Sequence, residues 1–258
     1  MRILAIGDVV GKNGTDFVRS ILPSYKREKG IDICIVNGEN SYDDNGITPA
    51  SADSLFVSGA DVITTGNHVY RRREIYNYLD EHEFLLRPAN FSKSNPGKGY
   101  AIVDKGRVRV GVVNLMGTAY MDSLENPFHV IEKVLKELDD CKVIIVDFHA
   151  EATSEKRALG LMLDGRVSAV FGTHTHVQTA DEQILPGGTG YITDIGMTGP
   201  INSVLGVKPE IIIKKFKDNM PAKFENADGP SMMNGCILDI DEKTGKTVSI
   251  ERVLIKGE

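Results

Sequence analysis

Short runs of β-branched residues alternate with helical patterns along the N-terminal third of the chain. The strand-like runs RILAIG, DICIVNGEN and DVITTGNH are followed by helical patterns near residues 13–28, 49–59 and 71–81. This order is typical of βαβ units, in which right-handed crossovers place successive strands parallel in one sheet. The sequence therefore predicts an α/β fold.

The second half of the chain has a different strand pattern. The stretch GYAIVDKGRVRVGVVNLMG alternates about Lys105-Gly106, which suits the turn of an antiparallel hairpin. Helical patterns near 127–139 and 153–163 lead into the strands KVIIVDFHAE and VSAVFGTHTHV, and the tail GCILDIDEKTGKTVSIERVLI has the pattern of a closing hairpin. Strands in two sets predict two packed mixed sheets flanked by helices.

No internal repeat, low-complexity segment or linker interrupts the chain, so we expect one domain over residues 1–258. Residues 196–230 are rich in Gly and Pro and have no clear period. They could form a loop, a lid or a segment that binds a partner. A homo-oligomer that uses this segment as a contact is one expectation.

The composition, with 41% hydrophobic and 26% charged residues, is ordinary for a soluble globular protein. No apolar run approaches the ~18 residues of a membrane span, and the run Ile3–Ile6 is too short for a signal peptide, so we expect a cytoplasmic protein without a membrane partner. A net charge of -6 argues against a strong nonspecific nucleic-acid surface.

The basic cluster Arg71–Arg73 is expected to open a helix as a solvated face, with attraction of phosphate as the weaker alternative. Three cysteines in strand-like runs are expected to be buried free thiols: Cys34, Cys141 and Cys236.

The opening stretch GDVVGKNG invites comparison with the P-loop of nucleotide triphosphatases. That loop needs four residues between its glycines and a Ser or Thr after its lysine. Only three residues separate Gly7 from Gly11, and Asn13 follows Lys12. We therefore expect Lys12 to be solvated, and the group that matters to be Asp8, at the end of the first strand, where open α/β sheets bind ligands.

Metal-capable side chains follow five predicted strands, and four of the six histidines lie at such strand ends. One such residue alone is more often a helix cap or a hydrogen-bonded core residue. Because parallel strands bring their carboxyl ends to one edge, we expect the whole group to converge there. The candidates are Asp8, Glu39, Asn40, Asn67, His149, His174 and His176, with His68 beside Asn67.

Carboxylate, amide and imidazole ligands together suit iron, manganese, zinc or nickel, whereas calcium and magnesium prefer oxygen ligands. Seven candidates are more than one ion needs, and they fit two ions ~3.5–4 Å apart that share a carboxylate. His174 and His176 point the same way in an extended segment but can diverge in a turn, so each could serve a separate ion. The absence of cysteine and the many oxygen ligands favour iron or manganese.

The motifs GD, GEN, GNH, FHAE and GTHTH resemble those of the calcineurin-like metallophosphoesterases, and their departures resemble the bacterial YmdB family. The superfamily usually has Asp-x-His in its first motif, but Val10 stands two residues after Asp8 here. Its bridging Asp is replaced by Glu39, and Asn40 can supply the missing ligand. The resemblance implies a calcineurin-like fold with the metal site at the carboxyl ends of the strands.

The resemblance also implies two ligand sets that share Glu39. One ion would be held by Asp8, Glu39, Asn40 and His176, and the other by Glu39, Asn67, His149 and His174. His68 would remain free for catalysis. The superfamily often has Asp after GNH, where this chain has Val69, so the partner that orients His68 must come from elsewhere or be absent. Iron is the metal to which the resemblance points, with manganese next.

The activity that the resemblance implies is a dinuclear metal-dependent phosphodiesterase for small phosphodiesters, in particular 2′,3′-cyclic nucleotides. A hydroxide bridging the ions would attack phosphorus in line while His68 protonates the leaving alkoxide. The alternatives are a metal-dependent enzyme of cell-envelope polymer metabolism and a regulatory RNA-associated protein with a residual site. The absence of a signal argues against the first, and the complete ligand set argues against the second. Four aromatic residues could stack a base, although packing is the simpler role: Tyr42, Tyr70, Phe91 and Tyr120.

Overall fold

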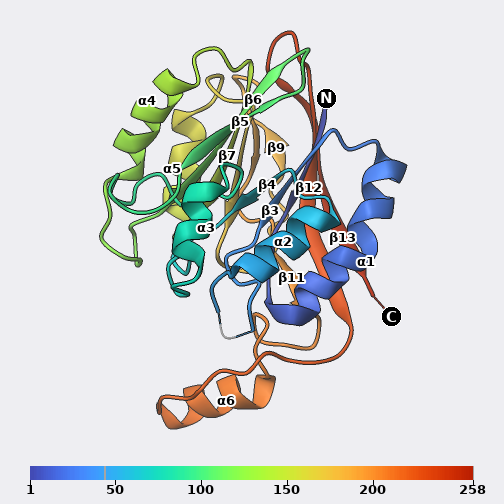
Figure 1. Cartoon of the computed structure of the whole chain (residues 1–258), viewed down its shortest axis with the longest axis vertical. Helices are drawn as coiled ribbons and strands as arrows, with labels where there is room; N and C mark the ends of the chain where they lie inside the picture. Colours follow the sequence, from blue (N-terminus) through green and yellow to red (C-terminus); the bar gives the residue numbers. More distant parts are fainter. Residues whose placement is uncertain (44, 258) are drawn as a thin grey trace.

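Two β-sheets pack face to face in the computed structural model, which describes residues 1–43 and 45–257. Apolar side chains from both inner faces form one buried cluster, to which Ile3 and Ile35 contribute from one sheet and Val112 and Ile145 from the other. Helices cover the two outer faces (Figure 1). The expected α/β architecture of two packed mixed sheets flanked by helices is confirmed.

The first sheet has seven strands in the order β2-β11-β12-β1-β3-β4, with β13 also paired to β12. Its strands are β1 (Arg2–Ile6), β2 (Asp8–Val9), β3 (Ile33–Asn37), β4 (Val62–Thr64), β11 (Met197–Pro200), β12 (Ser231–Ile240) and β13 (Thr247–Lys256). β1, β3 and β4 are parallel, as their βαβ pattern predicts. β12 runs antiparallel to β1 and forms the predicted closing hairpin with β13.

The second sheet has six strands in the order β5-β6-β7-β8-β10-β9. They are β5 (Tyr100–Asp104), β6 (Arg109–Met116), β7 (Val143–His149), β8 (Ala169–Thr173), β9 (Gln183–Ile184) and β10 (Gly190–Ile192). β5 and β6 form the predicted antiparallel hairpin, and Gly106 takes the left-handed conformation of its turn with φ 75°. β6, β7 and β8 are parallel, so their carboxyl ends lie at one edge.

Three helices pack on the first sheet: α1 (Gly11–Lys29), α2 (Pro49–Ser58) and α3 (Ile75–Glu81). On the second sheet pack α4 (Pro127–Glu137) and α5 (Thr153–Met162). The start of α2 is fixed by a capping box, in which Thr48 and Ser51 each accept a hydrogen bond from the other's backbone N–H. Within the described part of the chain, no helix is both long and apolar enough to cross a membrane.

The helix predicted from residue 71 begins only at Ile75, so the expectation that Arg71–Arg73 open it is wrong. The backbone N–H of Arg71 donates to the carbonyl of His68, which extends the preceding loop as a tight turn. Arg72 Nε donates to the carbonyl of Asn45, and its guanidinium lies 4.6 Å from the ring centroid of Tyr42. The basic cluster therefore belongs to a loop in which Arg72 packs, while Arg71 and Arg73 are exposed, as expected of a solvated cluster.

Residues 196–230 contain more regular structure than their composition suggests. They include β11, which pairs with both β2 and β12, and α6 (Pro209–Asp218). α6 projects away from the packed sheets (Figure 1), and the side chains of Phe216 and Met220 are 73% and 65% exposed. A role as a lid or partner-binding segment stays a prediction.

Candidate metal centre

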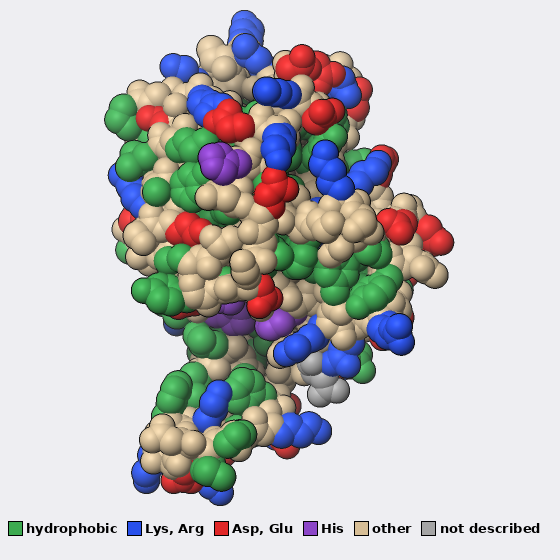
Figure 2. All heavy atoms as spheres, turned by 90° about the vertical axis from the view of Figure 1, so that its left-hand side faces the viewer, with side chains coloured by type: hydrophobic (Ala, Val, Ile, Leu, Met, Phe, Trp, Pro, Cys, Tyr) green, Lys and Arg blue, Asp and Glu red, His purple; other side chains and the backbone are tan. Residues whose placement is uncertain are grey.

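The predicted site residues come together at the carboxyl ends of strands from both sheets. Glu39 and Asn40 follow β3, Asn67 and His68 follow β4, His149 ends β7, and His174 and His176 follow β8. Asp8 follows β1 by two residues, as expected, and also begins the short strand β2, opposite Met197. Figure 2 shows histidine side chains gathered on the surface where the projecting α6 segment joins the body.

The first group surrounds the imidazole of His149, which is fully buried. His149 Nε2 lies 3.0 Å from Asn67 Oδ1, 3.1 Å from His174 Nδ1 and 3.3 Å from Glu39 Oε2. The ligand atoms of Glu39, His149 and His174 all lie within 4.8 Å of one another. Four potential ligands from the ends of four different strands therefore face one small volume.

The second group lies around Asp8, whose carboxylate is also fully buried. Asp8 Oδ1 is 3.7 Å from His176 Nε2, and that nitrogen is 3.5 Å from Asn40 Nδ2. Asn40 Nδ2 donates to Glu39 Oε1 at 2.8 Å. Glu39 thus borders both groups, as the resemblance implied for a shared carboxylate.

His68 borders both groups without being enclosed by either. Its backbone N–H donates to Glu39 Oε2 at 3.2 Å, and its Nδ1 lies 2.8 Å from Asn40 Oδ1. Since the amide oxygen can only accept, Nδ1 carries the proton and Nε2 is the nitrogen left to act on a ligand. The partner that orients His68 in place of the missing carboxylate is therefore Asn40.

Two backbone features bring these side chains together. A Cβ on Gly66 would lie 2.2 Å from His149 Nε2 and 2.4 Å from Glu39 Oε2, so only glycine fits before Asn67. His174 and His176 have φ of 97° and 63°. The His-x-His segment is therefore a turn, and its two imidazoles face different groups.

A buried ion pair stabilises the turn that carries His174 and His176. Lys156 Nζ donates to Asp194 Oδ2 at 2.7 Å and to the carbonyl of Thr173 at 2.8 Å. The same carboxylate oxygen accepts from the hydroxyl of Thr175 at 2.7 Å. Asp194 and Lys156 therefore fix the segment that carries both histidines, although neither stood out in the sequence.

The neutral tautomer of His149 is set by a chain of hydrogen bonds behind it. Thr173 donates its only hydroxyl hydrogen to Asp147 Oδ1 at 2.7 Å, so its oxygen accepts from His149 Nδ1 at 2.9 Å. The lone pair of neutral His149 is then on Nε2, which faces the site. Asp147 is fully buried, and burial raises its pKa to about 6 despite the hydrogen bond from Thr64.

The other two imidazoles are oriented in the same way. His176 Nδ1 donates to the carbonyl of Leu205 at 3.1 Å, which leaves its Nε2 toward Asp8. His174 Nε2 lies 3.2 Å from Glu151 Oε2, so that nitrogen donates and Nδ1 faces His149. Each histidine thus presents a lone pair to the site and a donor to a second partner, as metal-binding histidines do.

The protonation of these groups reflects close packing of opposite charges. Burial opposes the charge of His149, but the Glu39 and Asp8 carboxylates outweigh it and raise the pKa of this imidazole to about 9. Burial and the nearby His149 lower the pKa of His174 to about 4. Burial acts to raise the pKa of Glu39, yet the two neighbouring imidazoles hold it well below its ordinary value.

Comparison with known proteins decides the family. The family model described as YmdB-like protein matches residues 4–253. The chain belongs to the YmdB-like family. It is 48% identical to the 2′,3′-cyclic-nucleotide 2′-phosphodiesterase of Bacillus subtilis (strain 168), over 100% of this chain and 98% of that protein.

Two solved structures place this YmdB-like chain among known folds. A novel phosphatase from Mycoplasma pneumoniae superposes with a TM-score of 0.94 at 35% identity, over 99% of this chain and 93% of that one. The NAD nucleotidase of Haemophilus influenzae shares the fold, with a TM-score of 0.60 at 11% identity over 98% of this chain and 55% of that one. The calcineurin-like fold implies divalent metal ions.

Several other expectations can be compared with this YmdB-like structure. Lys12 is solvated, as expected, and forms an ion pair with Asp16 one turn along α1. Tyr70 packs edge-on against Phe91 with ring centroids 5.3 Å apart, whereas Tyr120 is 93% exposed. All three cysteines are free and buried, as expected.

Three residues that support the site were not predicted from the sequence: Glu151, Asp194 and Lys156. A signal for Glu151 was present in the motif FHAE, two residues after His149. Lys156 gave no signal, because SEKRALG has the composition of a solvated helix, yet its side chain is 1% exposed. Its burial depends on Gly172, where a Cβ would lie 2.9 Å from Lys156 Cδ.

Proposed function

We propose that this chain is a dinuclear metal-dependent phosphodiesterase that hydrolyses small phosphodiesters, with 2′,3′-cyclic nucleotides as its main substrates. The observation that carries the proposal is the convergence of two ligand groups on Glu39, with His68 free beside them. The identity to a 2′,3′-cyclic-nucleotide 2′-phosphodiesterase over the whole chain supports the choice of substrate.

The donor set fits divalent cations on two independent grounds. Among the described residues, Asp8 Oδ1 is buried without a hydrogen-bond partner. His149 Nε2 and His174 Nδ1 face each other at 3.1 Å, so a proton or a cation must lie between their lone pairs. Buried polar groups normally have partners, and a cation would satisfy all three atoms.

The residues that would hold the ions follow from the two groups. We assign Asp8, Asn40 and His176 to one ion and Asn67, His149 and His174 to the other, with Glu39 shared. Asn40 would bind through the Oδ1 lone pair that His68 does not use, because its Nδ2 can only donate. Two bound cations would supply an activated water and neutralise the charge of the phosphoryl group. Iron is the metal we favour, with manganese next, because the ligands combine imidazoles with several oxygens and no thiolate.

His68 would act as the proton donor. Its Nδ1 is committed to Asn40 Oδ1, so the proton delivered to the leaving oxygen comes from Nε2 of the imidazolium. The side chain is 24% exposed, which gives it access to a substrate at the mouth of the site. A ribose hydroxyl is a poor leaving group without such a donor.

A cavity of about 300 Å³ opens onto this site. Val10, Leu205 and Val207 give it an apolar wall, while Asn45 and Asn226 add amide groups. Amides can recognise the edge of a base and the apolar wall can contact its face. The cavity therefore supports a nucleotide rather than a large polymer as the substrate.

The test is hydrolysis by metal-loaded protein of phosphomonoesters, linear diesters and 2′,3′-cyclic nucleotides. We expect the highest kcat/KM with the cyclic nucleotides, and a 3′-monophosphate as the product of cleavage at the 2′ bond. Glu39→Ala, purified in parallel, controls for contaminating phosphatases and should be inactive. Faster hydrolysis of phosphomonoesters, or equal activity in the control, would contradict the proposal.

We also propose that residues 1–258 form one metallophosphoesterase domain, since both sheets contribute ligands to one site. A cytoplasmic location fits a substrate that arises from RNA.

Self-association through residues 196–230 is the oligomeric arrangement that we expect, and the exposed Phe216 and Met220 support it. Light scattering of Phe216→Ser protein tests this arrangement, because a mass equal to that of the unmodified protein would contradict it.

A further inference from the structure

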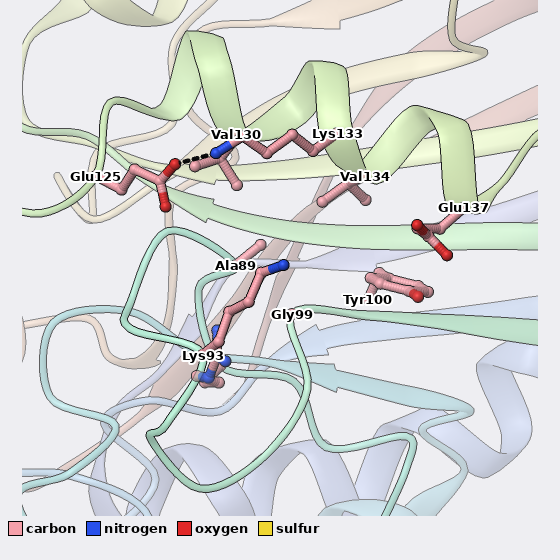
Figure 3. A pocket seen from close by; sticks show the side chains of 10 residues that line it. Ala89, Lys93, Gly99, Tyr100, Glu125, Val130, Lys133, Val134 and Glu137 are labelled. Carbon is pink, nitrogen blue, oxygen red and sulfur yellow. Dashed lines mark hydrogen bonds and ion pairs between the residues drawn. The ribbon is translucent and has the colours of Figure 1, made fainter.

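Two adjoining cavities lie beside β5 and the loop of residues 87–98, and Figure 3 shows the one that α4 also lines. Their volumes are about 270 and 520 Å³, and they share Arg87, Lys93, Gly99 and Tyr100 as lining residues. None of the described lining residues belongs to the candidate metal centre. We call this pair the α4 cavity.

Arg87 is the unusual residue of the α4 cavity. Its side chain is 5% exposed, yet within residues 1–43 and 45–257 it forms no ion pair with a carboxylate. Its Nη1 donates to the carbonyl of Pro88 at 2.8 Å and its Nη2 to the carbonyl of Ser92 at 3.4 Å, while its Nε has no partner among the same residues. Buried cations are normally paired, because removing an unpaired charge from water is costly. Burial accordingly lowers the pKa of Arg87.

A second cation faces the same space. Lys93 lines both cavities and has no ion pair within the described part of the chain. Lys98 also lines the larger cavity without an ion pair among these residues, whereas Lys133 pairs with Glu125 and Arg109 pairs with Asp140. Glu83 and Glu137 line the cavities too and form no ion pair among the same residues, so the charge of the lining is mixed. The buried Arg87, with the exposed Lys93 beside it, is the group that favours an anionic ligand.

The opposite wall of the α4 cavity is apolar in its middle and carries Glu125 and Glu137 at its two ends. Figure 3 shows Val130 and Val134 pointing from α4 into the space, with Ala89 and the ring of Tyr100 on its other sides. Binding sites for small molecules commonly combine such an apolar wall with a few charged groups that fix orientation. The α4 cavity has both parts, and its size suits a small organic molecule.

We propose that the α4 cavity is a second ligand site, which binds a small organic phosphate. Its phosphate dianion lies beside Arg87 and Lys93, where the guanidinium can donate two parallel hydrogen bonds. Its organic part lies against Val130, Val134 and the ring of Tyr100. This site is independent of the metal centre and of the reaction proposed there.

Calorimetric titration of the metal-loaded protein with adenosine 3′-monophosphate tests the site. We expect two binding events, of which Glu39→Ala removes the one at the metal centre and Arg87→Gln removes the other. Lys93→Ala should weaken the second event by about tenfold or more. Lys136→Ala, an exposed position on α4 outside the cavity, should keep both events. Arg87→Gln and Lys93→Ala should retain metal content and hydrolytic activity.

The affinities of inorganic phosphate and of adenosine show how much the phosphate and the nucleoside part of the ligand each contribute to binding. In the Glu39→Ala protein, adenosine 3′-monophosphate should bind at least about tenfold more tightly than phosphate, and adenosine should bind more weakly than the nucleotide. No binding of the nucleotide by the Glu39→Ala protein, an event there that survives Lys93→Ala unchanged, or equal affinity for phosphate and nucleotide would overturn the proposal. A single event that Glu39→Ala retains and Arg87→Gln removes would support the α4 site and count only against nucleotide binding at the metal centre. If Arg87→Gln does not fold, Lys93→Ala alone gives the answer.

Discussion

His68 Nδ1 lies 2.8 Å from Asn40 Oδ1, so an amide orients the imidazole that the sequence marks as the proton donor. In this chain Val69 stands where related enzymes often carry the orienting carboxylate. Asn40 also lies 3.5 Å from His176 and donates to Glu39. One residue therefore links the orientation of His68 to the groups assigned to the metal ions.

His68→Ala should separate proton donation from metal binding. If His68 holds no metal, the variant should keep its metal content while kcat for a 2′,3′-cyclic nucleotide falls by roughly 10²–10⁴-fold. A nitrophenyl ester should lose much less, because nitrophenolate leaves without a proton. Steady-state kinetics on both substrates provide the measurement. His149→Ala is the matched control and should lose metal and activity on both substrates alike. Equal losses on both substrates with His68→Ala would make it a positioning residue.

Gly66→Ala should damage the site although glycine has no ligand atom. The new Cβ would lie 2.2 Å from His149 Nε2, so the imidazole or the loop must move. We expect the variant to fold and to bind less metal, as measured by elemental analysis. Gly106→Ala is the control, because its Cβ would meet nothing within 4 Å, although its φ of 75° adds some strain. Full metal content in Gly66→Ala would show that the loop relaxes freely.

Metal binding should release a proton at neutral pH. The Glu39 and Asp8 carboxylates raise the pKa of His149 to about 9 against the effect of burial, so metal-free His149 is protonated at pH 7. It must lose that proton to bind a cation through Nε2, and metal affinity should rise by about tenfold per pH unit up to about pH 9. Calorimetry in buffers of different ionisation enthalpy counts the protons. An affinity that stays flat between pH 7 and 9 would contradict this assignment.

The raised pKa of His149 makes the metal-free protein less stable as the pH rises, although it makes metal binding tighter over the same range. Because the folded-state pKa of His149 is above the ordinary value of 6.5, its contribution to stability is complete below about pH 6.5 and is lost as the pH rises through about 9. Thermal unfolding of chelator-treated protein should therefore show a falling Tm over this range. His149→Gln should flatten that dependence.

Metal removal should also lower thermal stability. Each ion present at a hundred times its Kd stabilises the folded state by about 2.7 kcal/mol, which corresponds to roughly 5–10 °C in Tm per ion for a chain of this size. Differential scanning calorimetry with and without chelator measures the difference. Glu39→Ala should show little change on chelation, and a comparable shift in that variant would mean that the ions bind elsewhere.

Much of the fold could be predicted from the sequence because its signals are local. The turn at Lys105-Gly106 and the alternating runs beside it predict the β5–β6 hairpin, which is present. The position of β12 could not be predicted, since it pairs with β1 from the far end of the chain, with Cys236 opposite Ala5. Periodicity describes one segment and carries no information on its neighbours in a sheet.

The metal-capable residues of the candidate site could be predicted from the sequence, whereas the residues that support them could not. Strand ends and motifs predicted which metal-capable side chains would converge, because the topology of a parallel sheet brings strand ends together. The supporting contacts were not predictable. Lys156 and Asp194 form a buried pair between α5 and the segment after β10, and only tertiary packing makes a lysine in that helix inaccessible.

The metal content of the protein tests the central claim most directly. Elemental analysis of protein purified without chelator, at near-neutral pH and with metal in excess, should give about two transition-metal ions per chain, and Glu39→Ala should lose both or most of one. Iron should be the main metal in the unmodified protein. A saturated content of one ion or none per chain would contradict a dinuclear phosphodiesterase built on Glu39.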